Sequence, residues 1–108
     1  MDKLTYCFDI DNTICHSPDM GPYDKSTPYA DRIERINNLY DMGHTIFFMT
    51  ARGMGRTNND QKKAYMEMYD FTKEQLDSWG VKYHQLFLGK PGADLFIDDK
   101  NMNTKDWK

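Results

Sequence analysis

The sequence has few of the features that point to a secreted, zinc-binding or membrane protein. Its 108 residues include only two cysteines, Cys7 and Cys15, and no CxxC or Cys/His spacing typical of a zinc site. No apolar run approaches the roughly 18 residues of a membrane span. Residues 1–5 lack a basic stretch followed by an apolar one, so no signal peptide is predicted. We expect two reduced thiols in a cytoplasmic protein.

The net charge is also small, because acidic and basic residues nearly balance. The formal net charge is −3 and the pI is about 5.5, and both values weigh against general binding to nucleic acid. Hydrophobic residues make up 39% and aromatics 14%, which is typical of a folded chain. There are no repeats, low-complexity segments or linkers. The length therefore predicts one domain, residues 1–108, that buries about 65% of its unfolded surface.

What is present is an alternation of strand and helix patterns. Apolar runs predict strands over residues 4–10, 45–50, 83–88 and 94–97, the first of them buried on both faces. Helices are expected from residue 29 to about 42 and from 60 to 79, with a break near Asp70 where Thr72 and Gln75 match a capping box. A short helix is expected over 104–107. Strands separated by helices indicate an α/β fold with parallel strands.

Residues capable of chemistry follow each expected strand. In a parallel sheet, ligands bind outside the carboxyl ends of the strands. Asp9 and Asp11 are two apart, so on an extended chain their side chains point the same way. The full set is Asp9, Asp11, Thr50, Arg52, Lys90, Asp98 and Asp99. So many carboxylates need a cation, and Mg²⁺ suits them because it prefers oxygen ligands.

A cation, a lysine and a carboxylate nucleophile together indicate phosphoryl transfer. The cations neutralise charge on the transferring group. A carboxylate can attack phosphorus and form an aspartyl-phosphate. A second acid two residues further on can protonate the leaving oxygen and later activate water.

These residues resemble a known family. The segment DIDNT at 9–13, the apolar strand ending in Thr50, Lys90 and the segment IDD at 97–99 are similar to the four motifs of haloacid dehalogenase-type phosphatases. They occur in the family's order and span nearly the whole chain. The longer phrases TARG, QLDSWGVKYH and LGKPGADLFIDDK resemble a small-phosphatase branch associated with bacterial capsule and surface-polysaccharide synthesis.

The resemblance implies a role for each matching residue. Asp9 corresponds to the nucleophile and a metal ligand. Asp11 corresponds to the general acid/base, with a backbone carbonyl that also binds metal. Lys90 orients the nucleophile and the phosphoryl group. Asp98 and Asp99 correspond to the acidic metal pair, with Asp99 expected as the direct Mg²⁺ ligand.

The segment after the second strand is expected to bind substrate. Thr50 corresponds to the hydroxyl that holds the phosphate, and Ala51 and Arg52 follow it. Arg52 has two readings that the sequence leaves open, a substrate or phosphate contact and a salt bridge.

The family usually inserts a cap domain, and this chain has no room for one. We therefore expect a capless, three-layer Rossmann-like sandwich with strand order 4-1-2-3 and helices on both faces. Its open site must be covered by a large substrate, a partner or a second subunit. Residues 15–27 occupy the place of the family's mobile flap, where Tyr23 and Asp24 either contact substrate or belong to a plain surface loop. By association, the branch implies a sugar phosphate or similar small metabolite.

Two rival functions remain open. Capless relatives include polynucleotide 3′-phosphatases, although the acidic pI and the lack of an aromatic–basic stacking pattern weigh against one. A phospho-accepting receiver module also has an acidic Mg²⁺ pocket, a threonine and a lysine. Receivers, however, carry adjacent acids after the first strand, whereas here the adjacent pair comes last.

Overall fold

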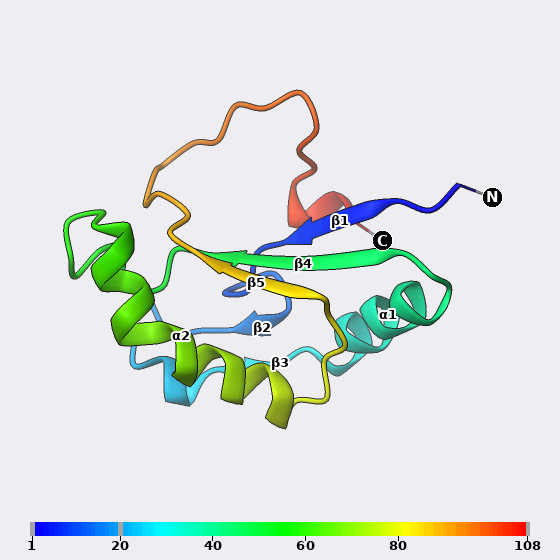
Figure 1. Ribbon diagram of the computed structural model, residues 1–108, viewed down its shortest axis with the longest axis horizontal. Coiled ribbons are helices and arrows are strands. Elements are labelled where there is room, and N and C mark those ends of the chain that lie inside the picture. Colours follow the sequence, from blue (N-terminus) through cyan, green and yellow to red (C-terminus); the bar gives the residue numbers. More distant parts are fainter. Residues whose placement is uncertain (1, 20, 108) are drawn as a thin grey trace.

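A three-stranded parallel sheet forms the centre of the molecule. The computed structural model describes residues 2–19 and 21–107. In it, strands β1 (Thr5–Phe8), β4 (Thr45–Thr50) and β5 (Gln85–Leu88) lie in the order β1-β4-β5 (Figure 1). The prediction of a small α/β fold with parallel strands is confirmed, and so is the relative order of the first three expected strands. No cap domain interrupts the described residues.

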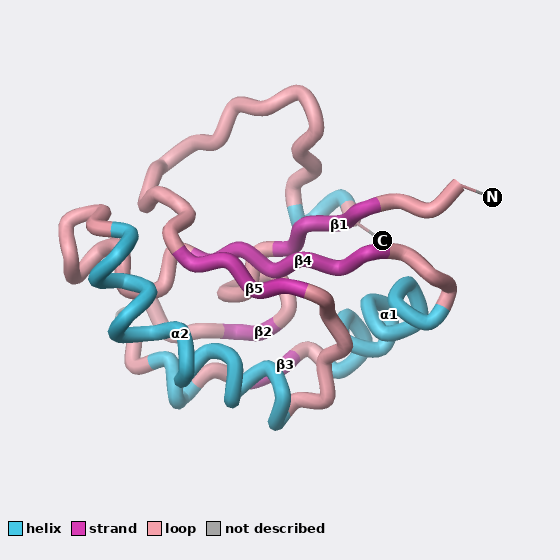
Figure 2. Tube along the Cα trace, in the orientation of Figure 1, coloured by secondary structure: helices cyan, strands magenta, loops and turns pink. Residues whose placement is uncertain are grey.

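Both long helices cover the same face of the sheet. Helix α1 (Ala30–Asp41) joins β1 to β4, and helix α2 (Gln61–Ser78) joins β4 to β5. Figures 1 and 2 show both on one side of the strands. Right-handed crossovers that add strands in one direction always place their helices on one face. The predicted three-layer arrangement with helices on both faces is therefore not found in the described residues.

Alternate side chains of the strands form the core. In β4 the buried residues Ile46 and Phe48 pack with Ile36 of α1 and Leu76 of α2. On the opposite face Phe87 is 39% exposed. In β1, Thr5 and Cys7 are exposed as well, whereas Phe8 is buried. The two long helices cover only one face of the sheet, and the expectation of a first strand buried on both faces was wrong. None of the described helices is long and apolar enough to span a membrane.

Helix α2 runs without the expected break near residue 70. It begins after Asp60, whose carboxylate caps the helix by accepting a hydrogen bond from the backbone N–H of Lys63 (3.1 Å). Thr72 does not cap a new helix, because its side chain is buried in the middle of α2 and its hydroxyl accepts a hydrogen bond from Arg52. A tertiary contact explains this residue better than the local capping pattern.

A short hairpin follows β1. The chain turns at Asn12, whose φ is 62°, and the carbonyl of Ile10 accepts hydrogen bonds from the N–H groups of Thr13 and Ile14. Strands β2 (Cys15–His16) and β3 (Thr27–Pro28) then pair antiparallel, with the 3₁₀ turn η1 (Tyr23–Lys25) between them. The sequence analysis expected a loop without strands here, either the family's flap or a plain surface loop.

The C-terminal segment does not join the sheet. Residues 89–103 form a loop that arches over the side of the sheet opposite the helices (Figure 2). We call residues 91–103 the arch. The predicted strand at 94–97 is not formed, and Ile97 is 91% exposed. No backbone hydrogen bond joins this stretch to β1 among the described residues, so the order 4-1-2-3 is not confirmed. The expected terminal helix is the 3₁₀ turn η2 (Thr104–Asp106).

Candidate functional site

Asp9 and Lys90 meet at the carboxyl edge of the sheet. Asp9 follows β1 and Lys90 follows β5, and Lys90 Nζ lies 3.9 Å from Asp9 Oδ2. Burial raises the pKa of Asp9, while the positive charge of Lys90 acts in the opposite direction. The two residues therefore form a partly buried carboxylate–ammonium pair.

The loop that carries Lys90 is held by its neighbours. The N–H of Lys90 donates to the carbonyl of Thr50 (3.2 Å), and Gln61 Nε2 donates to the carbonyl of Gly89 (2.9 Å). Gly89 has a φ of 95°, and a Cβ there would lie 3.1 Å from Gln61 Cγ. The positive φ therefore favours glycine at this position, and a larger residue would also have to push the Gln61 side chain aside. These contacts fix the backbone from which Lys90 reaches Asp9.

Thr50 ends β4 and is fully buried. Its Oγ1 accepts a hydrogen bond from the backbone N–H of Arg52 (3.1 Å), and the partly buried Ala51 lies between them. The expected phosphate-holding hydroxyl therefore lies beneath the surface in this structure. A role in binding phosphate stays a prediction for Thr50 and Ala51.

Arg52 makes an ion pair with Asp11. Arg52 Nη2 donates to Asp11 Oδ1 (2.9 Å) and Nε donates to Oδ2 (3.0 Å). The Arg52 side chain has no exposed surface, whereas that of Asp11 keeps 21%. The guanidinium lies 4.6 Å from the centre of the Tyr23 ring, and Nη1 donates to Thr72 (3.4 Å). Of the two readings left open for Arg52, the structure shows the salt bridge.

The hairpin supplies further polar groups around Asp11. Ser17 Oγ donates to Asp11 Oδ1, and the hydroxyls of Ser17 and Ser26 lie 2.6 Å apart. Both serines are buried. The sequence interpretation missed these serines, because nothing in their local pattern distinguishes them from ordinary loop residues. It assigned Thr72 to a capping box and so did not expect its contact with Arg52. Tyr23, which the sequence singled out in the flap, covers Arg52, whereas Asp24 is exposed.

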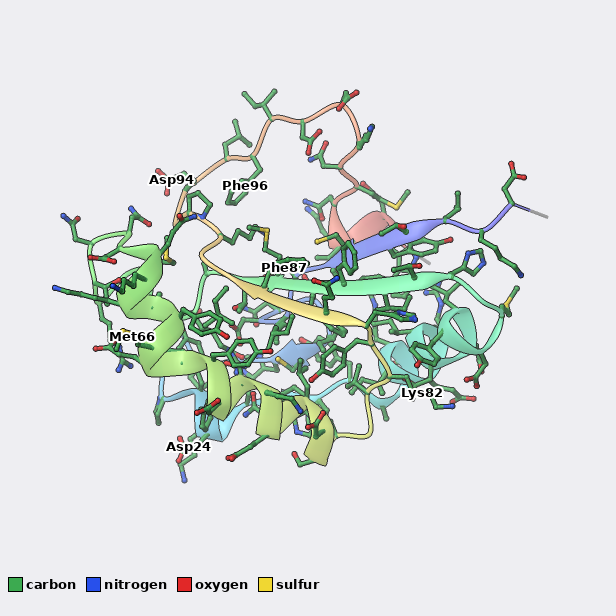
Figure 3. All side chains as sticks on the ribbon, in the orientation of Figure 1. Asp24, Met66, Lys82, Phe87, Asp94 and Phe96 are labelled. Carbon is green, nitrogen blue, oxygen red and sulfur yellow. The ribbon has the colours of Figure 1, made fainter. Side chains whose placement is uncertain are left out.

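Asp98 and Asp99 lie on the exposed arch. Asp98 Oδ1 accepts a hydrogen bond from the N–H of Lys100 (3.1 Å), which lowers the pKa of Asp98. The arch passes Lys90, whose Nζ lies 4.6 Å from the centre of the Phe96 ring. Figure 3 shows Phe96 on the same side of the sheet as Phe87.

The acids predicted to bind metal are not gathered together. In the described residues no group of three or more His, Cys, Asp or Glu side chains could hold a metal ion. Asp9 and Asp11 are neighbours at the sheet edge, and Asp11 has its carboxylate engaged by Arg52. The arrangement therefore does not by itself fit a bound Mg²⁺.

Comparison with known proteins supports the fold. No protein-family model matches the chain, and no curated protein matches it. A crystal structure of a protein from Vibrio cholerae, described only as an MCSG target, is similar, with a TM-score of 0.81 and 27% sequence identity. The match covers 94% of this chain and 84% of that one. The class that fold and comparison define is a small Rossmann-like α/β protein.

Proposed function

We propose that this chain is a phosphomonoester hydrolase of the haloacid dehalogenase type. The observation that carries the proposal is the approach of Lys90 Nζ to Asp9 Oδ2, 3.9 Å, at the carboxyl ends of two parallel strands. Asp11 lies next to this pair, near enough for its charge to affect the pKa of Asp9. A carboxylate, a fixed cation and a second carboxyl group are the parts that a two-step phosphoryl transfer needs.

The proposed reaction has two displacement steps. A carboxylate oxygen of Asp9 attacks phosphorus, and the bond to the leaving oxygen breaks. Asp11 enters this step with a proton on its carboxyl group and gives that proton to the leaving oxygen, which releases an alcohol. Water then attacks the phosphorus of the aspartyl-phosphate and passes a proton to Asp11. The bond to Asp9 breaks, which releases inorganic phosphate and restores both residues. Lys90 stabilises negative charge on the phosphoryl oxygens and holds Asp9 in place.

Magnesium is the cofactor that we propose on the strength of the sequence motifs. Asp9 and the backbone of Asp11 would supply some of its oxygen ligands, and Asp98 and Asp99 the others. The arrangement described above does not assemble this set, so the arch would have to bring its acids to the sheet edge. When bound, a hard divalent cation would neutralise charge on the phosphate.

The substrate that we propose is a small phosphorylated metabolite, such as a sugar phosphate of surface-polysaccharide synthesis. No cap covers Asp9, so a large substrate, a partner or a second copy of the chain would exclude water. Two shallow hollows of about 350 and 300 Å³ lie elsewhere, one beside Tyr83 and His84 and the other beside Pro28 and Trp79. The proposed setting is the cytoplasm, where the thiols Cys7 and Cys15, both free here, stay reduced.

The test is phosphate release with Mg²⁺ from a panel of sugar phosphates, nucleotides and a 3′-phosphorylated oligonucleotide. Asp9→Asn is the control, because the change is nearly isosteric and should abolish turnover while the fold stays intact. Release from sugar phosphates that the variant loses supports the proposal. Selective cleavage of the oligonucleotide would favour a polynucleotide 3′-phosphatase. A long-lived aspartyl-phosphate without turnover would favour a signalling module.

A further inference from the structure

Arg52 is an unusual residue because a full positive charge lies entirely inside the molecule. Its side chain has no exposed surface. A buried guanidinium is costly unless its charge is paired and its N–H groups have acceptors. Asp11 is the one carboxylate that the described ion pairs give to Arg52. In the folded protein, the charge of Arg52 is therefore balanced by the carboxylate of Asp11.

The contact constrains the Asp11 carboxylate in direction as well as in position. Two N–H groups of one planar guanidinium reach the two carboxylate oxygens, at 2.9 Å and 3.0 Å. Such fork-like pairing fixes the plane of both groups. Ser17 donates to Oδ1 as well. Oδ2 takes one hydrogen bond among the described groups, and Asp11 keeps 21% of its side-chain surface open.

Arg52 is itself held on several sides. The Tyr23 ring of the hairpin covers it at 4.6 Å, and the Phe71 ring of α2 lies 5.9 Å away. Thr72 accepts from Nη1. The N–H of Arg52 is bonded to Thr50 at the end of β4. Sheet, helix and hairpin thus all position the guanidinium, and through it Asp11.

We propose that Arg52 is a positioning residue that orients Asp11 for proton transfer and makes no contact with the substrate phosphate. The inference rests on the proposed phosphatase function and deepens it. It follows from burial, since a guanidinium with no exposed surface and a bidentate partner has no face left for a phosphate. Arg52 acts on the reaction only through the carboxylate that it aligns.

The kinetic test compares two leaving groups in Arg52→Lys, which keeps the charge but loses the fork. A hexose phosphate releases an alkoxide that needs a proton, whereas p-nitrophenyl phosphate releases a stable phenolate. We expect kcat/KM to fall about 10- to 100-fold for the hexose phosphate and less than about threefold for p-nitrophenyl phosphate. The inhibition constant of inorganic phosphate should not change. Arg56→Lys, an exposed arginine of the same loop, is the matched control.

Other outcomes overturn the inference. If kcat/KM of Arg52→Lys falls equally for the hexose phosphate and for p-nitrophenyl phosphate, the role of Arg52 is merely structural. Weaker inhibition by inorganic phosphate would make Arg52 a phosphate ligand. If Arg52→Lys does not fold, Ser17→Ala removes a hydrogen bond to Asp11 from the other side, and it should give the same leaving-group pattern with a smaller loss.

A measurement without catalysis separates this inference from the proposed function. The Nε proton of Arg52 in the wild-type protein should exchange slowly with water in an NMR spectrum, because it is buried and bonded to Asp11. Its signal should stay unshifted when inorganic phosphate is added. A rapidly exchanging or phosphate-sensitive signal overturns the pairing. A third outcome is a signal that exchanges slowly and does not respond to phosphate, in a protein that hydrolyses neither substrate. This outcome would confirm the Arg52–Asp11 pair. It would overturn both the catalytic role of the pair and the proposed function.

Discussion

Two pairs of acids lie in very different surroundings. Asp9 and Asp11 follow β1, where an ammonium group and a guanidinium compensate their charges. Asp98 and Asp99 lie exposed on the arch, and the contacts of their side chains with other described residues are local ones. The first pair is held by ion pairs with Lys90 and Arg52, whereas no ion pair of the described residues includes Asp98 or Asp99.

The difference shows what fixes a functional side chain in space. Around Asp9, contacts from β4, β5 and α2 hold the backbone loops, including the hydrogen bonds of Gln61 to Gly89 and of Lys90 to Thr50. Among the described residues, the hydrogen bond that joins the arch to a distant part of the chain runs from the N–H of Gly92 to Asn59 Oδ1 (2.9 Å), near the start of the arch. Its far end is held where Trp107 packs on Phe8, 5.0 Å between ring centres. Between these two points, the Phe96 ring lies 4.6 Å from Lys90 Nζ.

The largest expected effect comes from removing Mg²⁺ and tests whether the arch takes part. Chelation should stop phosphate release completely. Asp99→Asn should raise the Mg²⁺ concentration needed for half-maximal activity by about tenfold or more, by analogy with other losses at metal sites. Titrating activity against Mg²⁺ measures both. Full activity in chelator would contradict the metal proposal, and an unchanged Mg²⁺ requirement in Asp99→Asn would leave the arch outside the site.

Asp11→Asn should affect both activity and stability. Turnover should fall about 10²- to 10⁴-fold on a substrate whose leaving group needs a proton. Because Arg52 would lose its buried charge partner, the free energy of unfolding should also fall, by about 3 kcal/mol. Denaturant unfolding monitored by circular dichroism measures this change.

The matched control for that stability effect is Asp41→Asn. It breaks the exposed ion pair with Lys82 (2.8 Å) and should cost less than about 1 kcal/mol. Similar losses in the two variants would mean that the Arg52–Asp11 pair is no more buried in solution than a surface pair.

Local sequence patterns predicted the central strands and the long helices better than they predicted the side-chain contacts between them. An apolar run was enough to predict the strand at 45–50, and helical periodicity was enough for the first long helix. The second long helix was also predicted, but with a break near residue 70 that the structure does not have. The Arg52–Asp11 pair joins residues 41 positions apart, and no local pattern shows such a contact. The apolar run at 94–97 resembles a strand, yet a strand forms only where a neighbouring strand pairs with it. The capping pattern at Thr72 misled for a similar reason, since Arg52 takes up its hydroxyl.

In the hydrophobic core, substitution of Phe48 measures how closely the side chains are packed. It is fully buried and contacts Phe8 and Tyr83, with ring centres 6.0 and 5.7 Å away. Phe48→Ala should lower the free energy of unfolding by about 3–5 kcal/mol, through lost burial and the cavity that remains. A loss below about 1 kcal/mol would show that the helix-covered face is not a close-packed core.

Ile97→Ala is the matching substitution on the arch and should have the smallest effect. Because Ile97 is 91% exposed, its side chain loses almost no burial on truncation, and the free energy of unfolding should change by less than about 0.5 kcal/mol. The same denaturant titration measures it beside Phe48→Ala. A loss of 1 kcal/mol or more would mean that residues 94–97 pack in solution as the fourth strand that the sequence pattern favours. In that case Asp98 and Asp99 would follow a strand as Asp9 does, and the two pairs of acids would no longer differ in how they are held.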